Sequence, residues 1–296
     1  MTGPTGRRPA GPNRGAPAAC RAPRRAGNLL PRGASRPAGT PANRPQPPAP
    51  APCRFGEPLF ARSRKVRTAV TATPVIVAID GPAGTGKSST SKAVASRLGL
   101  GFLDTGAQYR AMTWWMLAHG VDVNDPAKVA AAAGEPAIVS GTDPLGPTIT
   151  VDGEDVSGPI RSQEVSGAVS AVSAVPEVRA VITALQRSIA AAAPTGIVAE
   201  GRDIGTTVLP DADVKIFLTA SPEIRAARRS AELSGKDAVG LAATQAALLK
   251  RDAADSARKA SPLAKAADAI EVDTSELTLE QVVDRVVTLI EERRQR

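Results

Sequence analysis

Residues 81–88 read GPAGTGKS, which matches the G-x-x-x-x-G-K-S pattern of loops that bind nucleotide phosphates. Glycines allow such a loop to turn its backbone N–H groups towards a phosphate, and the helix that follows adds the positive end of its dipole. Lys87 can reach the β and γ phosphates, and the Ser88 hydroxyl can bind Mg²⁺. The residues predicted to bind a nucleoside triphosphate are Gly81, Pro82, Ala83, Gly84, Thr85, Gly86, Lys87, Ser88 and Ser89.

The phosphate loop alone does not decide what the protein does, because the same loop occurs in kinases, switches, motors and pumps. A GTP-dependent switch would need an N-K-x-D sequence to read guanine, but no asparagine precedes a lysine in this chain. Motor and transporter ATPases need a longer chain than these 296 residues. Two classes remain at this point: a small phosphotransferase, and a nucleotide-binding module without catalytic activity.

Three further segments carry cations and hydroxyl groups that could bind a second substrate. They are LDTGAQYR at residues 103–110, EGRDIGT at residues 200–206 and KRDAADSARK at residues 250–259. A phosphoryl group in transfer spreads negative charge over three oxygens, so surrounding cations matter more than covalent catalysis. Each segment alone also fits a structural role, as a capped turn, a strand-end ion pair or a solvated helix face. The candidate residues are Thr105, Arg110, Glu200, Arg202, Asp203, Arg251, Asp255 and Arg258.

The elements around these segments predict an α/β fold in three layers. Short apolar runs typical of buried parallel strands occur at residues 75–80, 101–104, 196–201, 213–220 and 269–275. Helical patterns occur at residues 87–99, 107–120 and 176–193, and further helices should begin at Pro222 and Thr278. This alternation favours a five-stranded parallel sheet with helices on both faces. Ligands of such sheets bind at the carboxyl ends of the strands.

Residues 136–160 depart from the alternation of strands and helices. They are rich in glycine and contain short alternating runs, and VDGEDV at residues 151–156 predicts a tight hairpin. An all-β insertion in an α/β core is often a lid or a substrate clamp. We therefore expect this insertion to border a binding site.

Residues 1–70 differ in composition from the rest of the chain. They contain 14 of the 26 prolines, both cysteines, and 14 Lys or Arg against one acid, a net charge of +13. Because the whole chain carries +8, the remainder carries −5, which argues against nucleic-acid binding by the core. We expect residues 1–70 to be a disordered basic extension and residues 71–296 to form the folded domain. An organelle-targeting segment, an RNA- or anion-binding tail and a translation start at Val66 or Val70 stay open as alternatives.

No apolar stretch reaches the ~18 residues needed to span a bilayer, so we expect a soluble protein without a membrane partner. Cys20 and Cys53 both lie in the extension, so the predicted domain has no disulfide and no cysteine metal site. This cysteine usage fits a location in the reducing cytoplasm.

Six segments in order resemble bacterial cytidylate kinases, which are nucleoside monophosphate kinases of the P-loop NTPase superfamily. The segments are AIDGPAGTGKSS, LDTGAQYR, DGEDVSGPIRSQEVS, VSAVPEVR, AEGRDIGTTVLPDADVKIFLTAS and RDAADSAR. The resemblance runs from about residue 74 to 292 and leaves only the extension uncovered. It implies a monomer that transfers the γ-phosphoryl group of ATP, with Mg²⁺, to CMP or dCMP. The products would be ADP and CDP or dCDP.

The resemblance also implies individual roles. The residues expected around the CMP phosphate are Thr105, Arg110 and Arg202. Those expected at the cytosine ring are Ser170, Arg179 and Asp203, with the β-rich insertion at residues 136–160 beside them. Glu200 stands where some members have aspartate, so its role in substrate binding is the least defined.

A mobile lid is implied for about residues 222–260. Arg251, Asp255 and Arg258 are spaced at i, i+4 and i+7, which predicts that they share one face of a helix. Asp255 is expected to face the sugar hydroxyls and the two arginines to face the phosphates. The residues expected to take part directly in catalysis are Lys87, Arg202, Arg251 and Arg258.

The chemistry of cytosine supports the roles at the base. Cytosine offers an amino donor and two acceptors, which a carboxylate (Asp203) and a cation (Arg179) can match, whereas uracil leaves both groups mismatched. Each unpaired buried polar group costs about 1 to 3 kcal/mol, so a preference for CMP over UMP of roughly 10 to 10³-fold is expected. A non-catalytic module, and a related kinase acting on UMP or shikimate, remain as alternatives. His119 is expected only to end a helix.

Overall fold

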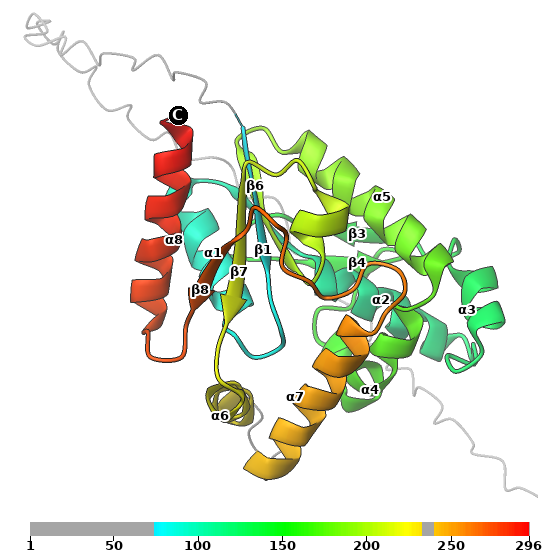
Figure 1. Ribbon diagram of the computed structural model, residues 1–296. Helices are drawn as coiled ribbons and strands as arrows, with labels where there is room; N and C mark the ends of the chain where they lie inside the picture. Colours follow the sequence, from blue (N-terminus) through cyan, green and yellow to red (C-terminus); the bar gives the residue numbers. More distant parts are fainter. Residues whose placement is uncertain (1–73, 233–239, 296) are drawn as a thin grey trace, which may run out of the picture. The chain divides into compact units, whose positions relative to one another are not determined.

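The structure is a computed structural model that describes residues 74–232 and 240–295. Its core is a sheet of five parallel strands in the order β2-β6-β1-β7-β8 (Figure 1). The strands are β1 (Val75–Asp80), β2 (Gly101–Asp104), β6 (Gly196–Gly201), β7 (Val214–Thr219) and β8 (Ile270–Asp273). Each coincides with one of the apolar runs in the sequence. The prediction of an α/β fold with a five-stranded parallel sheet is therefore confirmed.

Helices cover both faces of the sheet, because alternate side chains of a strand point to opposite sides. In β1, Val77 and Ile79 join the cluster formed with α1 (Lys87–Leu98) and α8 (Leu279–Arg294). Ala78 faces the other side, which α5 (Pro176–Ala192) and the π-helical turn η2 (Ile204–Val208) cover. The result is the expected three-layer arrangement, with α8 and α5 on opposite sides in Figure 1.

Several helix ends carry the signals that the sequence contains. α1 ends at Gly99, whose φ of 65° lies in the left-handed region that glycine tolerates. α5 begins with Pro176, which has no N–H to leave unpaired in the first turn. At the start of α8, the Thr278 hydroxyl accepts the Gln281 N–H at 3.3 Å and the Gln281 side chain accepts the Thr278 N–H at 2.9 Å. These local signals account for where the elements begin and end.

A second, three-stranded antiparallel sheet packs on α2 (Thr105–Ala118). Its strands are β3 (Ile138–Ser140), β4 (Ile149–Val151) and β5 (Glu154–Asp155). Asp152 and Gly153 form the turn between β4 and β5 with φ of 53° and 86°, as a tight hairpin turn requires. The Asp152 carboxylate accepts the Trp115 indole N–H at 2.8 Å and the Ala137 N–H at 2.9 Å, which ties the hairpin to α2.

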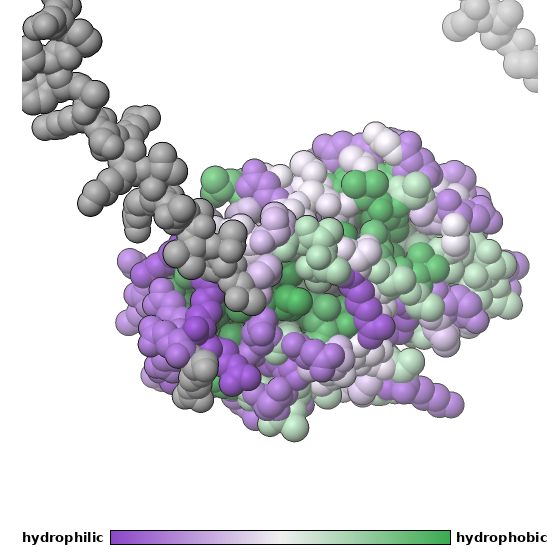
Figure 2. Space-filling view, turned by 90° about the horizontal axis from the view of Figure 1, so that it is seen from above, coloured by the Kyte–Doolittle hydropathy of each residue, from purple (hydrophilic) through white to green (hydrophobic). Residues whose placement is uncertain are grey.

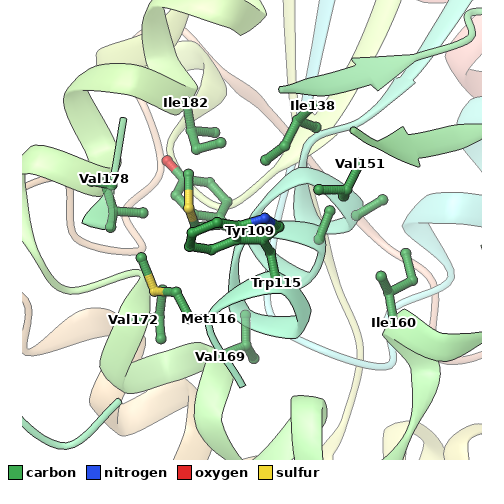
Figure 3. Close-up of a cluster of buried hydrophobic side chains, with 14 of the residues drawn as sticks. Tyr109, Trp115, Met116, Ile138, Val151, Ile160, Val169, Val172, Val178 and Ile182 are labelled. Carbon is green, nitrogen blue, oxygen red and sulfur yellow. The ribbon is translucent and has the colours of Figure 1, made fainter. Parts of the chain in front are cut away.

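Buried side chains join α2 to this small sheet and to two neighbouring helices (Figure 3). Tyr109 and Trp115 of α2 lie in the middle of the cluster, with residues of α4 (Gln163–Val172) and α5 around them. The surrounding side chains include Ile138, Val151, Ile160, Val169, Val172, Val178 and Ile182. This packing fixes the position of α2, whose first two turns carry two of the predicted substrate-binding residues.

Four further elements complete the structure. They are α3 (Pro126–Ala132), the 3₁₀ turn η1 (Pro159–Arg161), α6 (Pro222–Glu232) and α7 (Leu241–Ser256). α6 packs against α7. Because α7 ends at Ser256, Arg258 lies beyond the helix, and the prediction that it shares a helix face with Arg251 is wrong.

The extension predicted for residues 1–70 lies outside the described residues. Among those described, no single helix is long and apolar enough to cross a membrane; α4 and α5 meet that test only as a pair bent by 101°. Figure 2 views the end at which the strands begin, where hydrophobic residues reach the surface between hydrophilic ones. The polar residues predicted to bind substrate belong to the opposite end of the strands.

We predict that a side chain at Gly196, the first residue of β6, destabilises the fold. A Cβ atom there would lie 2.1 Å from the Val75 carbonyl oxygen, at a φ of 100°. Gly99→Ala is the matched control, since Gly99 also has a positive φ of 65° but nothing within 4 Å of its added Cβ. Urea denaturation should show a loss of about 1 to 2 kcal/mol for Gly99→Ala and roughly 3 kcal/mol or more for Gly196→Ala. Equal losses would contradict the clash.

Candidate active site

The predicted site residues converge because three adjacent strands end at the same edge. β6 lies between β1 and β2, and Asp80 pairs in register with Gly201 while Asp104 pairs with Glu200. The phosphate loop therefore leaves the sheet next to the turn that carries Arg202, and that turn lies next to the start of α2. This edge is the usual ligand site of an open α/β sheet.

The phosphate loop has the backbone shape that the motif predicts. Gly81, Gly84 and Gly86 have φ of 146°, 80° and 85°, and a Cβ on Gly81 would lie 2.2 Å from the Leu218 carbonyl oxygen. Lys87 Nζ donates to the Pro82 carbonyl oxygen at 2.6 Å. Burial lowers the pKa of Lys87 to about 7, and repulsion from Arg202 adds to this shift.

Ser88 and Ser89, at the start of α1, are exposed. Their hydroxyl groups are therefore free of the packing that buries Lys87. The contacts of Ser88 and Ser89 with a nucleotide or its metal ion stay a prediction.

The phosphate loop is also held by α6 and α7. Asp252 of α7 accepts the Ala83 N–H at 3.1 Å and forms an ion pair with Arg225 of α6. Arg225 in turn donates to the Ala83 carbonyl oxygen at 3.2 Å. Both polar groups of the Ala83 peptide are thus bound by the two helices. Neither Asp252 nor Arg225 was among the residues predicted to form the site, although Asp252 lies inside the RDAADSAR segment.

The acceptor side begins with Thr105 and Arg110 on α2. The Thr105 hydroxyl donates to the Glu200 carbonyl oxygen at 2.6 Å, and Arg110 pairs with Asp104 at 2.9 Å. Burial tends to raise the pKa of Asp104, but Arg110 and the Ala107 N–H outweigh it, so this pKa lies below its ordinary value. Arg161, another cation near Asp104, lines a shallow pocket with it and was not assigned from the sequence.

Glu200 is buried, with 3% of its surface exposed, and neither carboxylate oxygen has a hydrogen-bond partner among the described residues. Burial raises its pKa to about 7, and repulsion from Asp104 acts in the same direction. The nearby Ser88 hydroxyl group and the positive charge of Lys87 act in the opposite direction on this pKa, so the carboxylate lies next to the phosphate loop, although no hydrogen bond of normal geometry is formed. A buried carboxylate without a partner is a candidate to face a bound cation.

The predicted cytosine-binding residues lie on three elements. Arg179 of α5 forms an ion pair with Asp203, and its guanidinium lies 5.4 Å from the centre of the Tyr109 ring. Arg179 also donates to the Ser173 carbonyl oxygen at 3.3 Å. Ser170 lies on α4, one turn before Ser173. The structure thus places Arg179 and Asp203 in contact, with Ser173 as an additional polar neighbour that the sequence did not single out.

Arg202, Asp255 and Arg258 form one ion-pair network. Arg202 Nε donates to one oxygen of Asp255 at 3.1 Å, and Arg258 binds the other oxygen. Arg258 also donates to the Ser173 hydroxyl at 3.1 Å. Because two arginines engage both oxygens of Asp255, a sugar hydroxyl would have to share them.

Arg251 differs from the other predicted cations. Within residues 74–232 and 240–295 it has no ion pair closer than 4.0 Å, and its Nε has no hydrogen-bond partner. Burial lowers its pKa to about 10, and the nearby Arg202 adds to this shift. Arg251 therefore stays protonated near neutral pH and keeps its charge available.

Fold and site together define a class of protein. The phosphate loop follows β1, and two arginines predicted to bind the acceptor, Arg110 and Arg202, follow the next two strands, β2 and β6 (we call them the acceptor-side arginines). This is the arrangement of an α/β P-loop kinase. A family model described as "Cytidylate kinase" matches residues 77–292. The chain belongs to the cytidylate kinase family, as the six segments of the sequence predict.

Curated relatives agree with the family match. Cytidylate kinase from Streptomyces griseus subsp. griseus is 76% identical over 220 residues, which cover 74% of this chain and 94% of that protein. Cytidylate kinase from Streptomyces coelicolor is 74% identical over 226 residues, covering 76% of this chain and 96% of that protein. Cytidylate kinase from Nocardia farcinica is 54% identical over 222 residues, covering 74% and 94%.

We predict that Glu200→Gln changes how stability depends on pH. The pKa of Glu200 rises from its ordinary 4.5 to about 7 on folding, so between these values the folded state binds more protons than the unfolded state. The free energy of unfolding of the wild type, relative to Glu200→Gln, should therefore fall as pH rises from about 5 to about 8. Urea denaturation with EDTA and without nucleotide measures this difference. A difference that does not vary with pH would contradict the assigned environment of Glu200.

Proposed function

We propose that the protein is an ATP-dependent CMP and dCMP kinase, which transfers the γ-phosphoryl group of ATP to the phosphate of CMP or dCMP. The observation that carries this proposal is the meeting of the phosphate loop and the acceptor-side arginines at the ends of β1, β2 and β6, in a chain of the cytidylate kinase family. The products are ADP and CDP or dCDP. We place the reaction in the cytoplasm and on a monomer.

The phosphate loop holds the donor. Its N–H groups and Lys87 bind the β and γ phosphates, which draws Lys87 Nζ away from the Pro82 carbonyl oxygen. The residues present also fit Mg²⁺, because the exposed Ser88 hydroxyl lies near the buried, unpartnered carboxylate of Glu200. The described residues contain no cluster of three or more His, Cys, Asp or Glu that could hold a metal ion by itself. When bound, Mg²⁺ neutralises charge on the β and γ oxygens.

The acceptor-side arginines hold the CMP phosphate in line with the donor. Arg110 and Arg202 bind its oxygens, and Thr105 lies at the start of α2 beside them. The attacking oxygen of a nucleotide phosphate is already an anion, so the reaction needs no general base. His119 accordingly has no catalytic role in this proposal: it ends α2 and stacks on Trp115 with 4.0 Å between ring centres.

Arg179 and Asp203 select the base. Their ion pair is nearly inaccessible, with side-chain exposures of 6% each. In this environment a carboxylate that accepts the cytosine amino group would face a carbonyl oxygen in uracil, and both would remain unpaired. Ser170 on α4 completes the base site.

Helices α6 and α7 act as the lid over the transferring group. Arg251 brings an unpaired cation to the γ phosphate, and Arg258 assists it. Exclusion of water matters because water competes with CMP as the phosphoryl acceptor. A lid whose arginines are ordered by the acceptor therefore suppresses hydrolysis of ATP.

A coupled assay of ADP release tests the substrate assignment. The full chain is incubated with Mg-ATP and, in separate reactions, CMP, dCMP, UMP, AMP and shikimate. We expect CMP and dCMP to be phosphorylated at least about tenfold more efficiently than UMP, and the other two acceptors to be inactive. Lys87→Ala is the control for contaminating kinases. Binding of ATP without transfer to any acceptor, or a preference for UMP or shikimate, would overturn the proposal.

We predict that Arg251→Met reduces kcat with CMP by about 10³ to 10⁵-fold, because the variant lacks the cation that stabilises the transferring group. Methionine preserves most of the length and apolar contact of the side chain. Lys250→Met is the matched control, since Lys250 is the preceding residue of α7 and is exposed. Steady-state kinetics of both variants measure the effect. Near-normal turnover by Arg251→Met would remove this arginine from the mechanism.

A further inference from the structure

We propose that Asp80 is a positioning residue that sets the acceptor-binding turn, residues 201–205, against the phosphate loop. The inference rests on the proposed function, because this turn carries Arg202 and Asp203. The roles of those two residues follow from the family resemblance, whereas the role of Asp80 follows from its contacts.

Asp80 is the last residue of β1 and immediately precedes the phosphate loop. It is 4% exposed, so water cannot satisfy its carboxylate. One oxygen accepts the Ile204 N–H at 2.9 Å, and the other accepts the Gly205 N–H at 2.8 Å. The two oxygens of the Asp80 carboxylate therefore accept hydrogen bonds from two successive backbone N–H groups of a single turn. These N–H groups lie 124 and 125 residues away in sequence.

The two amides directly follow the predicted substrate-binding residues. Arg202 and Asp203 directly precede Ile204. The position of the Ile204 and Gly205 N–H groups therefore determines where the Cα atoms of Arg202 and Asp203 lie. A Cβ on Gly205 would make a tight contact of 3.2 Å with a Lys215 side-chain atom but only an ordinary contact of 3.5 Å with an Asp80 oxygen.

Only a carboxylate of this length offers two acceptors and no donor at this position. In Asp80→Asn one oxygen is replaced by an NH₂ group, which would face a backbone N–H and leave that N–H buried without a partner. The turn would then shift away from β1, while the phosphate loop keeps its own glycine geometry. Misplacement of a substrate-binding group by about 1 Å can cost as much as ~10²-fold in activity.

The test compares Asp80→Asn with Asp213→Asn in steady-state kinetics. Asp213 is the matched control, because its carboxylate also accepts a backbone N–H of β1, that of Ile76 at 2.8 Å, but at the opposite end of the strand. Burial raises the pKa of Asp80 to about 6. An assay at about pH 8 therefore keeps the wild-type carboxylate ionised.

For Asp80→Asn we expect KM for CMP to rise by about tenfold or more and the preference for CMP over UMP to fall, with KM for ATP changed less than about twofold. Asp213→Asn should leave all three quantities unchanged. Either role lets Asp80→Asn lower the thermal unfolding temperature, but a merely structural role would change KM for CMP and KM for ATP alike. That result, or unchanged kinetics, would overturn the inference.

A second variant covers the case in which Asp80→Asn does not fold. Asp80→Glu keeps the charge and both acceptor atoms but adds a methylene group, which displaces the carboxylate from the Ile204 and Gly205 N–H groups, so it should raise KM for CMP selectively as well. Equal changes in KM for CMP and ATP would count against the inference. The wild-type assay distinguishes failure of the proposed function from failure of the inference about Asp80. If the wild type does not phosphorylate CMP, both are overturned. Normal wild-type activity with no selective effect in either variant overturns only the role of Asp80.

Discussion

The parallel pairing of β6 between β1 and β2 is the constraint on which the whole site depends. Adjacent strands lie about 4.8 Å apart, so groups that leave them at the same edge can reach one small ligand. Thr105 and Glu200 are 95 residues apart in sequence, yet a hydrogen bond of 2.6 Å joins them where β2 and β6 end. A slip of one residue in β6 would turn Glu200 and Arg202 to the other face of the sheet and separate them from the phosphate loop.

Buried ion pairs arrange the cations of the acceptor side. Arg179 pairs with Asp203 and Arg202 with Asp255, and each pair joins two elements that are distant in sequence. Such pairs contribute little net stability, since desolvation offsets most of the attraction, but loss of one partner leaves a buried charge unpaired and costs about 3 to 5 kcal/mol. Their effect here is on placement. They hold the Arg179 guanidinium beside Asp203, at the predicted base site, and the Arg202 guanidinium beside Asp255, at the predicted phosphate site.

The parts of the structure that the sequence predicts are those with local signals. The strands follow from apolar runs, the phosphate loop from its glycines, and the start of α8 from Thr278 and Gln281. The position of Arg258 was predicted wrongly because the helical spacing of charged residues continues past Ser256, where the helix itself ends. Asp80 and Asp252 were missed because their partners are remote: Asp252 binds Ala83, 169 residues away, and no local pattern identifies such a contact. The residue types in a segment indicate which ligands it could bind. Which carboxylates instead hold a remote backbone segment, as Asp80 and Asp252 do, depends on how distant segments pack together.

Helix α7 illustrates how an element can be anchored without using the cation that the proposed reaction needs. Asp252 and Asp255 are three residues apart and therefore lie on the same side of the helix. Asp252 binds the phosphate loop and Arg225, whereas one oxygen of Asp255 binds Arg202 of the acceptor side and the other binds Arg258. Arg251 lies four residues before Asp255 and faces the same region, but both anions near it already have partners. The two carboxylates thus tie α7 to the phosphate loop and to Arg202, and the charge of Arg251 stays available for the phosphoryl group of the proposed reaction.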